Sequence, residues 1–502
     1  MKSQKKAGVL LSYVNIALNM VVNLVLTPML ITILSDETYS IYKVIHSLSA
    51  PLVIFNLGLA TVTARFVARF RAMENADKKE KENALAMTMT VAAVMAGCVL
   101  FVAFLLLQLI PYLYGNNYSP EQILLAKQLF SVFTLCAAVN ILADTFKGCV
   151  TGNERFAFSN GIHTLYYLIK LGMTIVFLKL GFGALGVAIV DLINSLLSLA
   201  LYAGFTFFRL HERIHLHSWN RREFQTILSF SLAMLLQTIV NQVNNNVDMI
   251  ILGAMVEEKQ IITMYSAALS IYGIYNSLVS VLANVLFPDA VRLVARDSTG
   301  EELTDFVIVP GRIQAMISVA IIAAFTLFGK DFITLWIGPE YSNVHAVALM
   351  LLIPVTIPLV QNVCLTILDA KMKRMVRSVV LCIMALFNIV ATIILVKCIG
   401  YWGAAIATAL SLVLGHGLLM NTYYHRTIGL NVLRMFREIF KGTLPCGIVA
   451  ALLCLPLTFI AGNSLILFLV KCLCFCCVYG LLMWCFGCNN QEKAQLRKLL
   501  RR

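Results

Sequence analysis

Charged side chains are scarce in this chain of 502 residues. Only 13% of the residues are Asp, Glu, Lys or Arg, and acids are the rarer kind, at 25 against 39 basic residues. Soluble proteins carry about 25% charged residues. Long stretches hold no charge at all, such as the 38 residues from Asn83 to Pro120. The shortage excludes a soluble globular protein.

Catalytic motifs are also missing. The chain has no Walker A sequence, no GxSxG elbow and no HExxH pair. It also lacks the large extramembrane loops in which membrane glycosyltransferases and ligases keep their chemistry. We therefore expect a protein that is not an enzyme.

Cysteine is plentiful, with 14 residues, but the surroundings of these residues argue against metal chemistry. Cys472, Cys474, Cys476 and Cys477 cluster in one apolar run, with only Lys471 as a polar neighbour. A metal site needs converging ligands and usually a polar second shell. We expect small apolar packing residues, no metal and no cofactor.

Hydrophobic runs fill the chain instead. A spanning helix needs about 20 apolar residues, and 60% of this chain is hydrophobic. We predict an all-α integral membrane protein of about fourteen transmembrane helices, with the first run a permanent span rather than a signal peptide. The predicted spans are 8–34, 39–64, 84–111, 121–146, 158–178, 184–208, 224–254, 261–288, 306–329, 343–368, 377–397, 402–422, 442–461 and 464–486.

Basic residues are distributed unevenly between the loops on the two sides. With the N-terminus inside, the cytoplasmic loops and both termini carry 30 Lys and Arg residues, and the other loops carry 4. This asymmetry predicts a multi-pass protein with both termini cytoplasmic. It also explains most of the net charge of +14, so the charge gives no reason to expect a nucleic-acid partner.

Short matches recur at an offset of about 220 residues. Arg65–Arg69 resembles Arg292–Arg296, and Gly115–Ser119 resembles Gly338–Ser342. The pattern predicts two parallel six-helix repeats related by an axis along the membrane normal. The predicted parts are an N-terminal lobe (1–212), a C-terminal lobe (223–424), and two extra helices with a basic cytoplasmic tail (431–502).

Two predicted helices, the first of each repeat, carry polar stripes at helical spacing. Amides and a carboxylate are costly in lipid, so we expect the stripes to face each other or a wet cavity. Another predicted span adds Tyr272 and Asn276. The stripes are Ser12, Asn15, Asn19, Asn23 and Thr27, and Gln237, Asn241, Asn244, Asn245 and Asp248.

Five basic residues lie within predicted spans. A charge near the bilayer centre costs at least about 2.5–3.5 kcal/mol on insertion scales, so it usually has a partner or a function. We expect Lys43, Lys170 and Arg312 to line a cavity, whereas Lys127 and Lys471 are near span ends and can snorkel. Among the acids, Asp248 is the candidate functional carboxylate. Asp191 has the alternative of pairing with a neighbouring helix.

Amides, tyrosines and cations in one cavity suit a substrate with many hydroxyls and an anionic group. Asn and Gln side chains both donate to and accept from sugar hydroxyls. Lys and Arg attract phosphate most strongly away from bulk water. These residue types indicate an oligosaccharide that carries phosphate.

Three segments resemble a known family. The segments are VDMIILG (Val247–Gly253), GPEYS (Gly338–Ser342) and GYWGAAIATALS (Gly400–Ser411). With fourteen predicted spans they resemble the Wzx-type O-antigen and exopolysaccharide flippases of the multidrug/oligosaccharidyl-lipid/polysaccharide exporter superfamily. The resemblance implies a two-lobed, V-shaped bundle with a central cavity in the bacterial cytoplasmic (inner) membrane. It also places Asp248 where the family carries an acid in this span.

The leading hypothesis is thus an alternating-access flippase for surface polysaccharide biosynthesis, with a polyprenyl-pyrophosphate-linked oligosaccharide as the cargo. Membrane lipids are expected partners, and other polysaccharide-assembly proteins are candidates. H⁺ or Na⁺ is a candidate coupling ion at Asp248. A cation-coupled multidrug exporter of the same superfamily is an alternative, although its cavity should be acidic. A membrane glycan polymerase or ligase is a third, which predicts a large periplasmic loop.

Overall fold

The structure is a computed structural model, and its described part is all-helical. It describes residues 2–73, 78–219, 221–285, 287–296, 298–371, 374–460, 462, 464–489 and 492–493, without the side chains of 2–10, 281–289 and several positions within 222–240 and 374–375. The described helices pack into two compact units, Met1–Thr263 and Met264–Arg502. Each unit is described by itself below.

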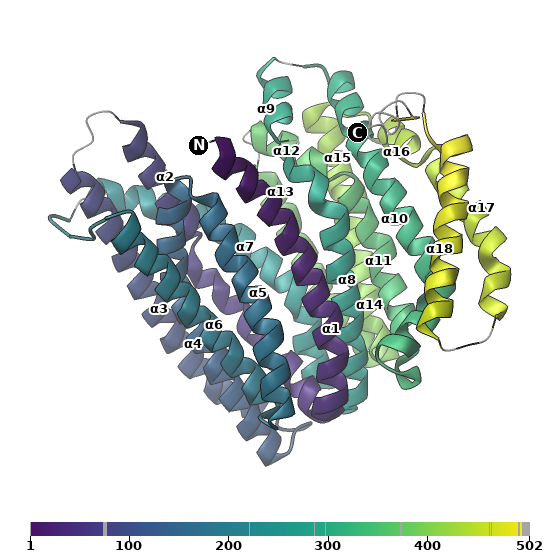
Figure 1. The fold of residues 1–502 in the computed structure, drawn as a ribbon, viewed down its shortest axis with the longest axis horizontal. Helices are drawn as coiled ribbons and strands as arrows, with labels where there is room; N and C mark the ends of the chain where they lie inside the picture. The colour runs from purple at the N-terminus through teal and green to yellow at the C-terminus, as the bar shows by residue number, and fades with distance from the viewer. Residues whose placement is uncertain are drawn as a thin grey trace. The chain divides into compact units, whose positions relative to one another are not determined.

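The first unit is a bundle of long helices (Figure 1). Helix α4 packs against α2, α3 and α6, and α1 packs against α5. The last helix, α7, packs against α1, η1 and α3. The elements are α1 (Lys2–Ser49), η1 (Ala50–Asn56), α2 (Leu59–Ala72), α3 (Lys78–Tyr114), α4 (Pro120–Gly152), α5 (Phe156–Lys179), α6 (Gly183–Gly204), η2 (Phe205–Arg209) and α7 (Arg221–Met255), followed by the start of α8 (Lys259–Val285).

The chain bends sharply at two places between Lys2 and Ala72. Helix α1 breaks at Ser35, whose backbone is non-helical with φ 62° and ψ 156°. A short 3₁₀ segment follows α1 where Pro51 stands, and Leu57 and Gly58 then take left-handed conformations before α2 begins. Proline cannot continue an α-helical hydrogen-bond ladder, which accounts for the second bend.

Small residues let α2 and α4 approach closely. Gly148 and Gly152 are one turn apart on α4, and a Cβ at Gly148 would lie 2.6 Å from the carbonyl oxygen of Ala60 on α2. A Cβ at Gly152 would lie 2.8 Å from the carbonyl oxygen of Ala64. This is the small-xxx-small pattern through which membrane helices pack backbone to backbone.

The second unit contains the remaining helices (Figure 1). Helix α10 packs against α11, α16, α17 and α18, and α13 packs against α14. The elements after α8 are α9 (Phe287–Ala295), α10 (Gly300–Trp336), η3 (Pro339–Tyr341), α11 (Val344–Val360), α12 (Asn362–Ala370), α13 (Arg374–Ile399), α14 (Trp402–Leu412), η4 (Val413–Met420), α15 (Asn421–Tyr423), η5 (Tyr424–Ile428), α16 (Val432–Phe440), α17 (Thr443–Cys454), η6 (Leu455–Phe459), α18 (Leu465–Leu482) and η7 (Met483–Gly487).

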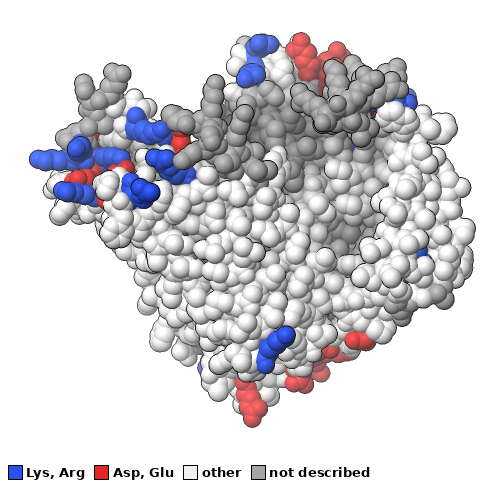
Figure 2. Space-filling model, viewed as in Figure 1, with Lys and Arg blue, Asp and Glu red and all other residues white. Residues whose placement is uncertain are grey.

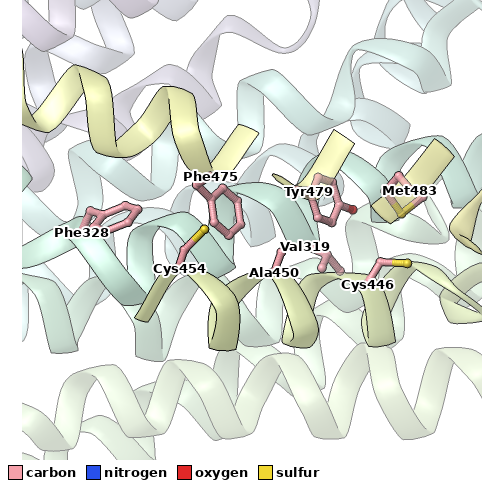
Figure 3. Packing of buried hydrophobic residues seen from close by; sticks show 8 residues of the cluster. All are labelled: Val319, Phe328, Cys446, Ala450, Cys454, Phe475, Tyr479 and Met483. Atoms are coloured by element: carbon pink, nitrogen blue, oxygen red, sulfur yellow. The ribbon is translucent and has the colours of Figure 1, made fainter. Parts of the chain in front are cut away.

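The last two long helices, α17 and α18, share an apolar core with α10 (Figure 3). Phe475 and Tyr479 of α18 stack with ring centroids 6.0 Å apart. Cys446 and Cys454 of α17 are buried in the same cluster. Both cysteines lie in apolar packing. Among the described residues, no group of three His, Cys, Asp or Glu side chains is placed to hold a metal ion.

Length and composition make this a multi-pass membrane protein. Eleven described helical segments are long and apolar enough to cross a membrane, and one of them, Leu11–Ala72, has 62 residues. On the face drawn in Figure 2, uncharged atoms cover most of the surface, and Lys and Arg gather over α2 and α3 at one end of the first unit. The predicted all-α membrane fold is confirmed. The count of fourteen spans, the two repeats and the lobe boundaries stay predictions.

Candidate functional site

An ion pair lies within the helices of the first unit. Lys170 of α5 contacts Asp191 of α6, with 2.8 Å between Nζ and Oδ1, and the two side chains are 23% and 13% exposed. Each charge offsets the cost of burying the other. Lys170 was predicted to line a cavity, and Asp191 was predicted to have the alternative of pairing with a neighbouring helix. The pairing of Asp191 is confirmed, and it compensates the charge of Lys170.

Aromatic side chains surround this ion pair. The ammonium of Lys170 lies 5.9 Å from the ring centroid of Tyr166, one turn earlier on α5. Tyr42 and His46 of α1 are within electrostatic range of both charges. The rings of Tyr42 and His46 stack at 6.2 Å, and Phe133 of α4 meets both edge-on. The cluster offers phenol and imidazole groups beside a compensated charge.

Lys43 carries a charge that no carboxylate offsets among the described residues. Its Nζ lies 5.4 Å from the ring centroid of Tyr39, one turn earlier on α1, and its side chain is half-buried. A cation over an aromatic ring is stabilised by the ring quadrupole yet keeps its hydrogen-bond donors. Of the three predicted cavity cations, Lys43 therefore has the charge best placed to attract an anion.

The first polar stripe divides into two parts. The side chain of Asn15 donates to the carbonyl of Asn160 on α5 at 2.9 Å, and Thr164 donates to Asn15 at 2.7 Å. This part of the stripe joins α1 to α5. Further along, Asn23 donates to the side chain of Asn19 at 3.0 Å, and Asn23 is exposed. Only the part with Asn19 and Asn23 keeps capacity for a ligand.

The second polar stripe lies on α7, in the first unit. Asn241 and Asn245 are exposed, Asn244 is half-buried, and Asp248 is only 5% exposed. The side chain of Gln237 lies outside the described residues. The predicted C-terminal lobe that begins at residue 223 stays a prediction. The contacts of α7 with α1, η1 and α3 place Asp248 in the same compact unit as Lys43 and Lys170.

Gly253 shows why α7 approaches α1 so closely. A Cβ at Gly253 would lie 2.6 Å from a methyl carbon of Val44 on α1 and 3.2 Å from the ring of Tyr114 on α3. The glycine that ends the segment Val247–Gly253 thus serves helix packing.

Tyr272 and Asn276 of α8 lie in the second unit. Tyr272 is partly buried against an apolar cluster that includes Tyr275 and Leu352, and Asn276 is exposed. The predicted wet face of α8 is thus only partly available, because Tyr272 contributes to packing.

Arg312 was predicted to line a cavity, but the structure buries it among protein partners. Its side chain is 3% exposed, and its Nε donates to Glu492 at 2.7 Å. The remaining nitrogens donate to Glu492 and to the backbone carbonyls of Glu438, Lys441 and Gly487 at 2.6–3.3 Å. These partners leave no donor for a substrate phosphate. Arg312 ties α10 to α16 and the C-terminal segment, which the sequence did not reveal because Glu492 is 180 residues away.

Lys471 also differs from expectation. The sequence predicted snorkelling, but Lys471 of α18 is 3% exposed and pairs with Asp331 of α10, with 2.7 Å between Nζ and Oδ2. Helix α10 continues to Trp336, beyond the predicted end at residue 329, so Asp331 stands on the helix and faces α18.

An apolar groove of about 380 Å³ lies in the second unit, between α10, α11, α16 and α17. Its two hydroxyl-bearing residues, Thr326 and Thr356, donate to carbonyls of their own helices at 2.7 and 2.9 Å. With their hydroxyls engaged, the groove offers hydrocarbon contacts only. Sequence periodicity could not locate it because most of its lining comes from stretches of α10, α11 and α17 that are apolar on every side.

Comparisons with known proteins place the chain in a family. The family described as polysaccharide biosynthesis protein matches residues 5–294, more than half of the chain. The chain belongs to this family. A search of curated proteins finds no match.

Solved structures share the fold at low sequence identity. A lipid II flippase, MurJ, in an inward closed conformation superposes with a TM-score of 0.74 at 14% identity, covering 95% of this chain and 97% of that one. An inward-facing multidrug resistance transporter of the MATE family and the MOP superfamily gives 0.69 at 14% identity, covering 84% and 96%. The family match thus confirms a polysaccharide biosynthesis protein, and the solved structures confirm the fold.

Proposed function

We propose that this chain is a flippase that moves a polyprenyl-diphosphate-linked oligosaccharide across the cytoplasmic membrane by alternating access. The observation that carries the proposal is the match to the polysaccharide biosynthesis family joined to a flippase fold along nearly the whole chain. Transporters, rather than enzymes, share this fold. The membrane is the bacterial inner membrane, and both termini are cytoplasmic.

In this proposal the cations and amides of the first unit hold the cargo. Lys43 attracts the diphosphate, because its charge has no carboxylate partner among the described residues. Asn23, Asn241 and Asn245 are exposed and can donate to and accept from sugar hydroxyls. Lys170 holds Tyr166 and Asp191 in place and contributes little net charge.

Taken by itself, the apolar groove of the second unit suits a hydrocarbon chain. A polyprenyl chain has no hydrogen-bonding groups, and the groove presents none. Ala451 of α17 lines it. Replacing Ala451 with Trp would fill the groove and should slow export, whereas the same change at Leu452, an exposed residue outside the groove, should not.

Asp248 is the proposed coupling group for H⁺ or Na⁺. It is the only acid of the second stripe, and it is 5% exposed within α7. A buried carboxylate changes its hydration strongly when it binds a cation, so binding can favour one conformation over another. Asp248→Asn keeps the shape and removes the charge, so it should abolish any dependence of export on the ion gradient.

The test is complementation of glycan export in cells that lack this gene. Lys43→Ala and Asp248→Asn should lower surface glycan several-fold at normal protein level. Lys127→Ala is the matched control, because Lys127 is also a half-buried lysine within a helix of the first unit. Full export by both variants would contradict the assignment of these residues to the site. Normal surface glycan in the deletion strain would contradict the proposed function itself.

A multidrug exporter is the second candidate, favoured by the likeness to a multidrug resistance transporter. It predicts drug sensitivity in the deletion strain, with surface glycan unchanged. If the deletion strain loses surface glycan and keeps its drug resistance, the flippase is the correct function.

A further inference from the structure

A second cavity lies in the first unit, at the end where Lys and Arg gather (Figure 2). Its volume is about 800 Å³, and α2, α4 and the start of α5 line it. None of its charged residues belongs to the polar stripes or the ion pair described above. In the sequence these residues count only among the loop charges that set the orientation in the membrane, so the sequence does not show that they lie close together.

Cations outnumber acids around this cavity. Arg65 and Arg71 of α2 and Lys147 of α4 line it, together with one acid, Glu154. Glu154 sits in the turn between α4 and α5 with a left-handed backbone, φ 57°. The two backbones that carry these charges are held close by Gly148 and Gly152, so the cations of α2 and α4 converge.

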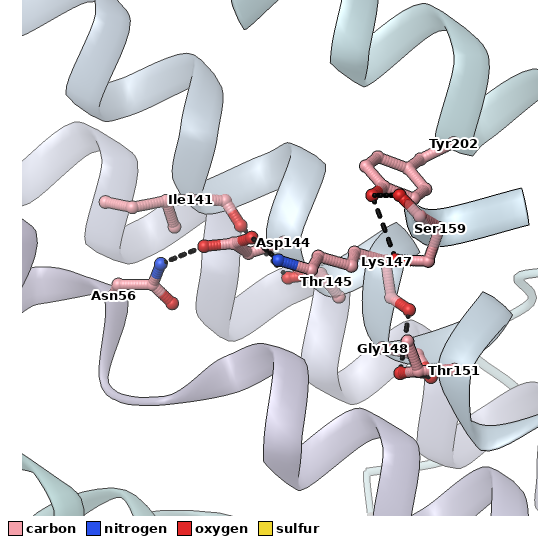
Figure 4. Close-up of polar contacts among 9 residues, drawn as sticks. All are labelled: Asn56, Ile141, Asp144, Thr145, Lys147, Gly148, Thr151, Ser159 and Tyr202. Atoms are coloured by element: carbon pink, nitrogen blue, oxygen red, sulfur yellow. Dashed lines mark hydrogen bonds and ion pairs between the residues drawn. The ribbon is translucent and has the colours of Figure 1, made fainter. Parts of the chain in front are cut away.

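Two of the ion pairs that the cavity residues make are loose. Arg71 lies 3.6 Å from Glu154, with the side chains 38% and 33% exposed. Lys147 lies 3.9 Å from Asp144, an acid whose other oxygen accepts from Asn56 (Figure 4). Partly exposed pairs of this kind contribute little to stability, because water screens them. An anion of higher charge can therefore replace these carboxylates at little cost.

Part of the lining of the cavity is apolar. Ala60, Ala64 and Ala68 recur at steps of four along α2, and Phe156 of α5 also lines the cavity. Methyl groups leave room beside the helix and offer only hydrocarbon contacts. The cavity thus combines a cationic rim with an apolar face, which a free sugar or a free phosphate would use only in part.

We propose that this cavity binds the phosphate or diphosphate group of a lipid, with the lipid chain along the alanine face of α2. Arginine recognises phosphate oxygens through paired hydrogen bonds, and lysine does so as a point charge. Basic residues at membrane ends attract anionic lipid headgroups. The chemistry is shared by the lipid-linked cargo and by an anionic phospholipid, and the test below separates the two sources.

The experiment titrates the purified full chain in detergent and counts bound lipid by native mass spectrometry. The probes are undecaprenyl diphosphate, phosphatidylglycerol and inorganic diphosphate. Arg65→Ala/Lys147→Ala should weaken binding of the preferred lipid at least about tenfold, since the double variant loses two charged hydrogen-bond donors. If the double variant binds only undecaprenyl diphosphate more weakly, the site binds the lipid-linked cargo. If it binds both lipids equally more weakly, the site binds lipid phosphates in general.

Two further variants keep the test decisive. Arg69→Ala is the matched control, because Arg69 is an exposed arginine of α2 that does not line the cavity. It should bind as the wild type does. Glu154→Gln removes the competing carboxylate and should tighten binding, which a misfolded variant cannot do.

Three results would overturn the proposal: unchanged binding by the double variant, equal weakening by Arg69→Ala, or inorganic diphosphate binding as tightly as the lipids. Glycan export is scored separately. If the double variant no longer binds lipid but still exports glycan, the proposed flippase function holds and this cavity does not take part in transport. If the deletion strain has normal surface glycan, the proposed flippase function is wrong, whereas the proposed lipid-binding site is unaffected.

Discussion

Lys170 and Asp191 illustrate how single residues act within the membrane. Removing one partner leaves a buried charge alone, whereas removing both removes the cost of burial as well. We expect Lys170→Met to lower the free energy of unfolding by about 3–5 kcal/mol, and Lys170→Met/Asp191→Leu to recover most of it. Thermal unfolding in detergent measures both. Equal destabilisation by the single and the double variant would contradict a compensated pair.

Lys259 adds a pH-dependent residue at the turn between α7 and α8. It donates to the carbonyl of Asn117 at 2.8 Å and lies 3.8 Å from the ring centroid of Tyr118. Burial lowers the pKa of Lys259 to about 8, although the nearby carboxylates of Glu37 and Glu257 raise it. Between this value and the ordinary lysine pKa of 10.5, the unfolded chain binds more protons, so stability should rise with pH.

The prediction for Lys259 follows from that sign. The stability of the wild type relative to Lys259→Met should increase as the pH rises from 8 to 10, measured by thermal unfolding in detergent. Below pH 8 both states keep the proton and the difference should be flat. A difference that falls across this range would show that the folded state favours the charged form.

At the scale of helices, the contact between α2 and α4 depends on glycine. A Cβ at Gly148 would meet backbone and side-chain atoms of α2 at 2.6 Å, and backbone cannot move aside cheaply. Gly148→Ala should destabilise the chain by about 1–3 kcal/mol, the usual cost of overpacking. Gly161 of α5 has no atom within 4 Å of an added Cβ, so Gly161→Ala is the control and should be neutral or stabilising. Equal effects at both positions would contradict the close packing.

The positions of several helices followed closely from the sequence, because lipid imposes length and apolarity on each span. The predicted span 158–178 became α5 at Phe156–Lys179, and 224–254 became α7 at Arg221–Met255. The partners of the charges did not follow. Arg312 meets Glu492 across 180 residues, and Lys471 meets Asp331 across 140. No local pattern encodes such distances.

At the scale of the whole molecule, orientation in the membrane is the property to test. Cys398 and Cys485 are both exposed thiols. The basic-residue asymmetry places Cys398 near an outer loop and Cys485 near the cytoplasmic tail. In single-cysteine variants, a membrane-impermeant maleimide should label Cys398 in intact cells and Cys485 only after lysis. The opposite pattern would invert the predicted topology, and labelling of both in intact cells would contradict the odd number of spans predicted between the two cysteines.

The sequence by itself determined the class of this protein, the approximate positions of several long helices, and its family. Those features depend on composition, periodicity and short motifs, all of which are local. Only the tertiary structure decided which polar groups are used in packing. It joined Asn15 to α5, compensated Lys170 with Asp191, tied Arg312 to the C-terminal segment, and placed Asp248 on a helix of the first unit. A buried charge takes whichever partner the packed helices bring near, and packing is a property of the whole fold.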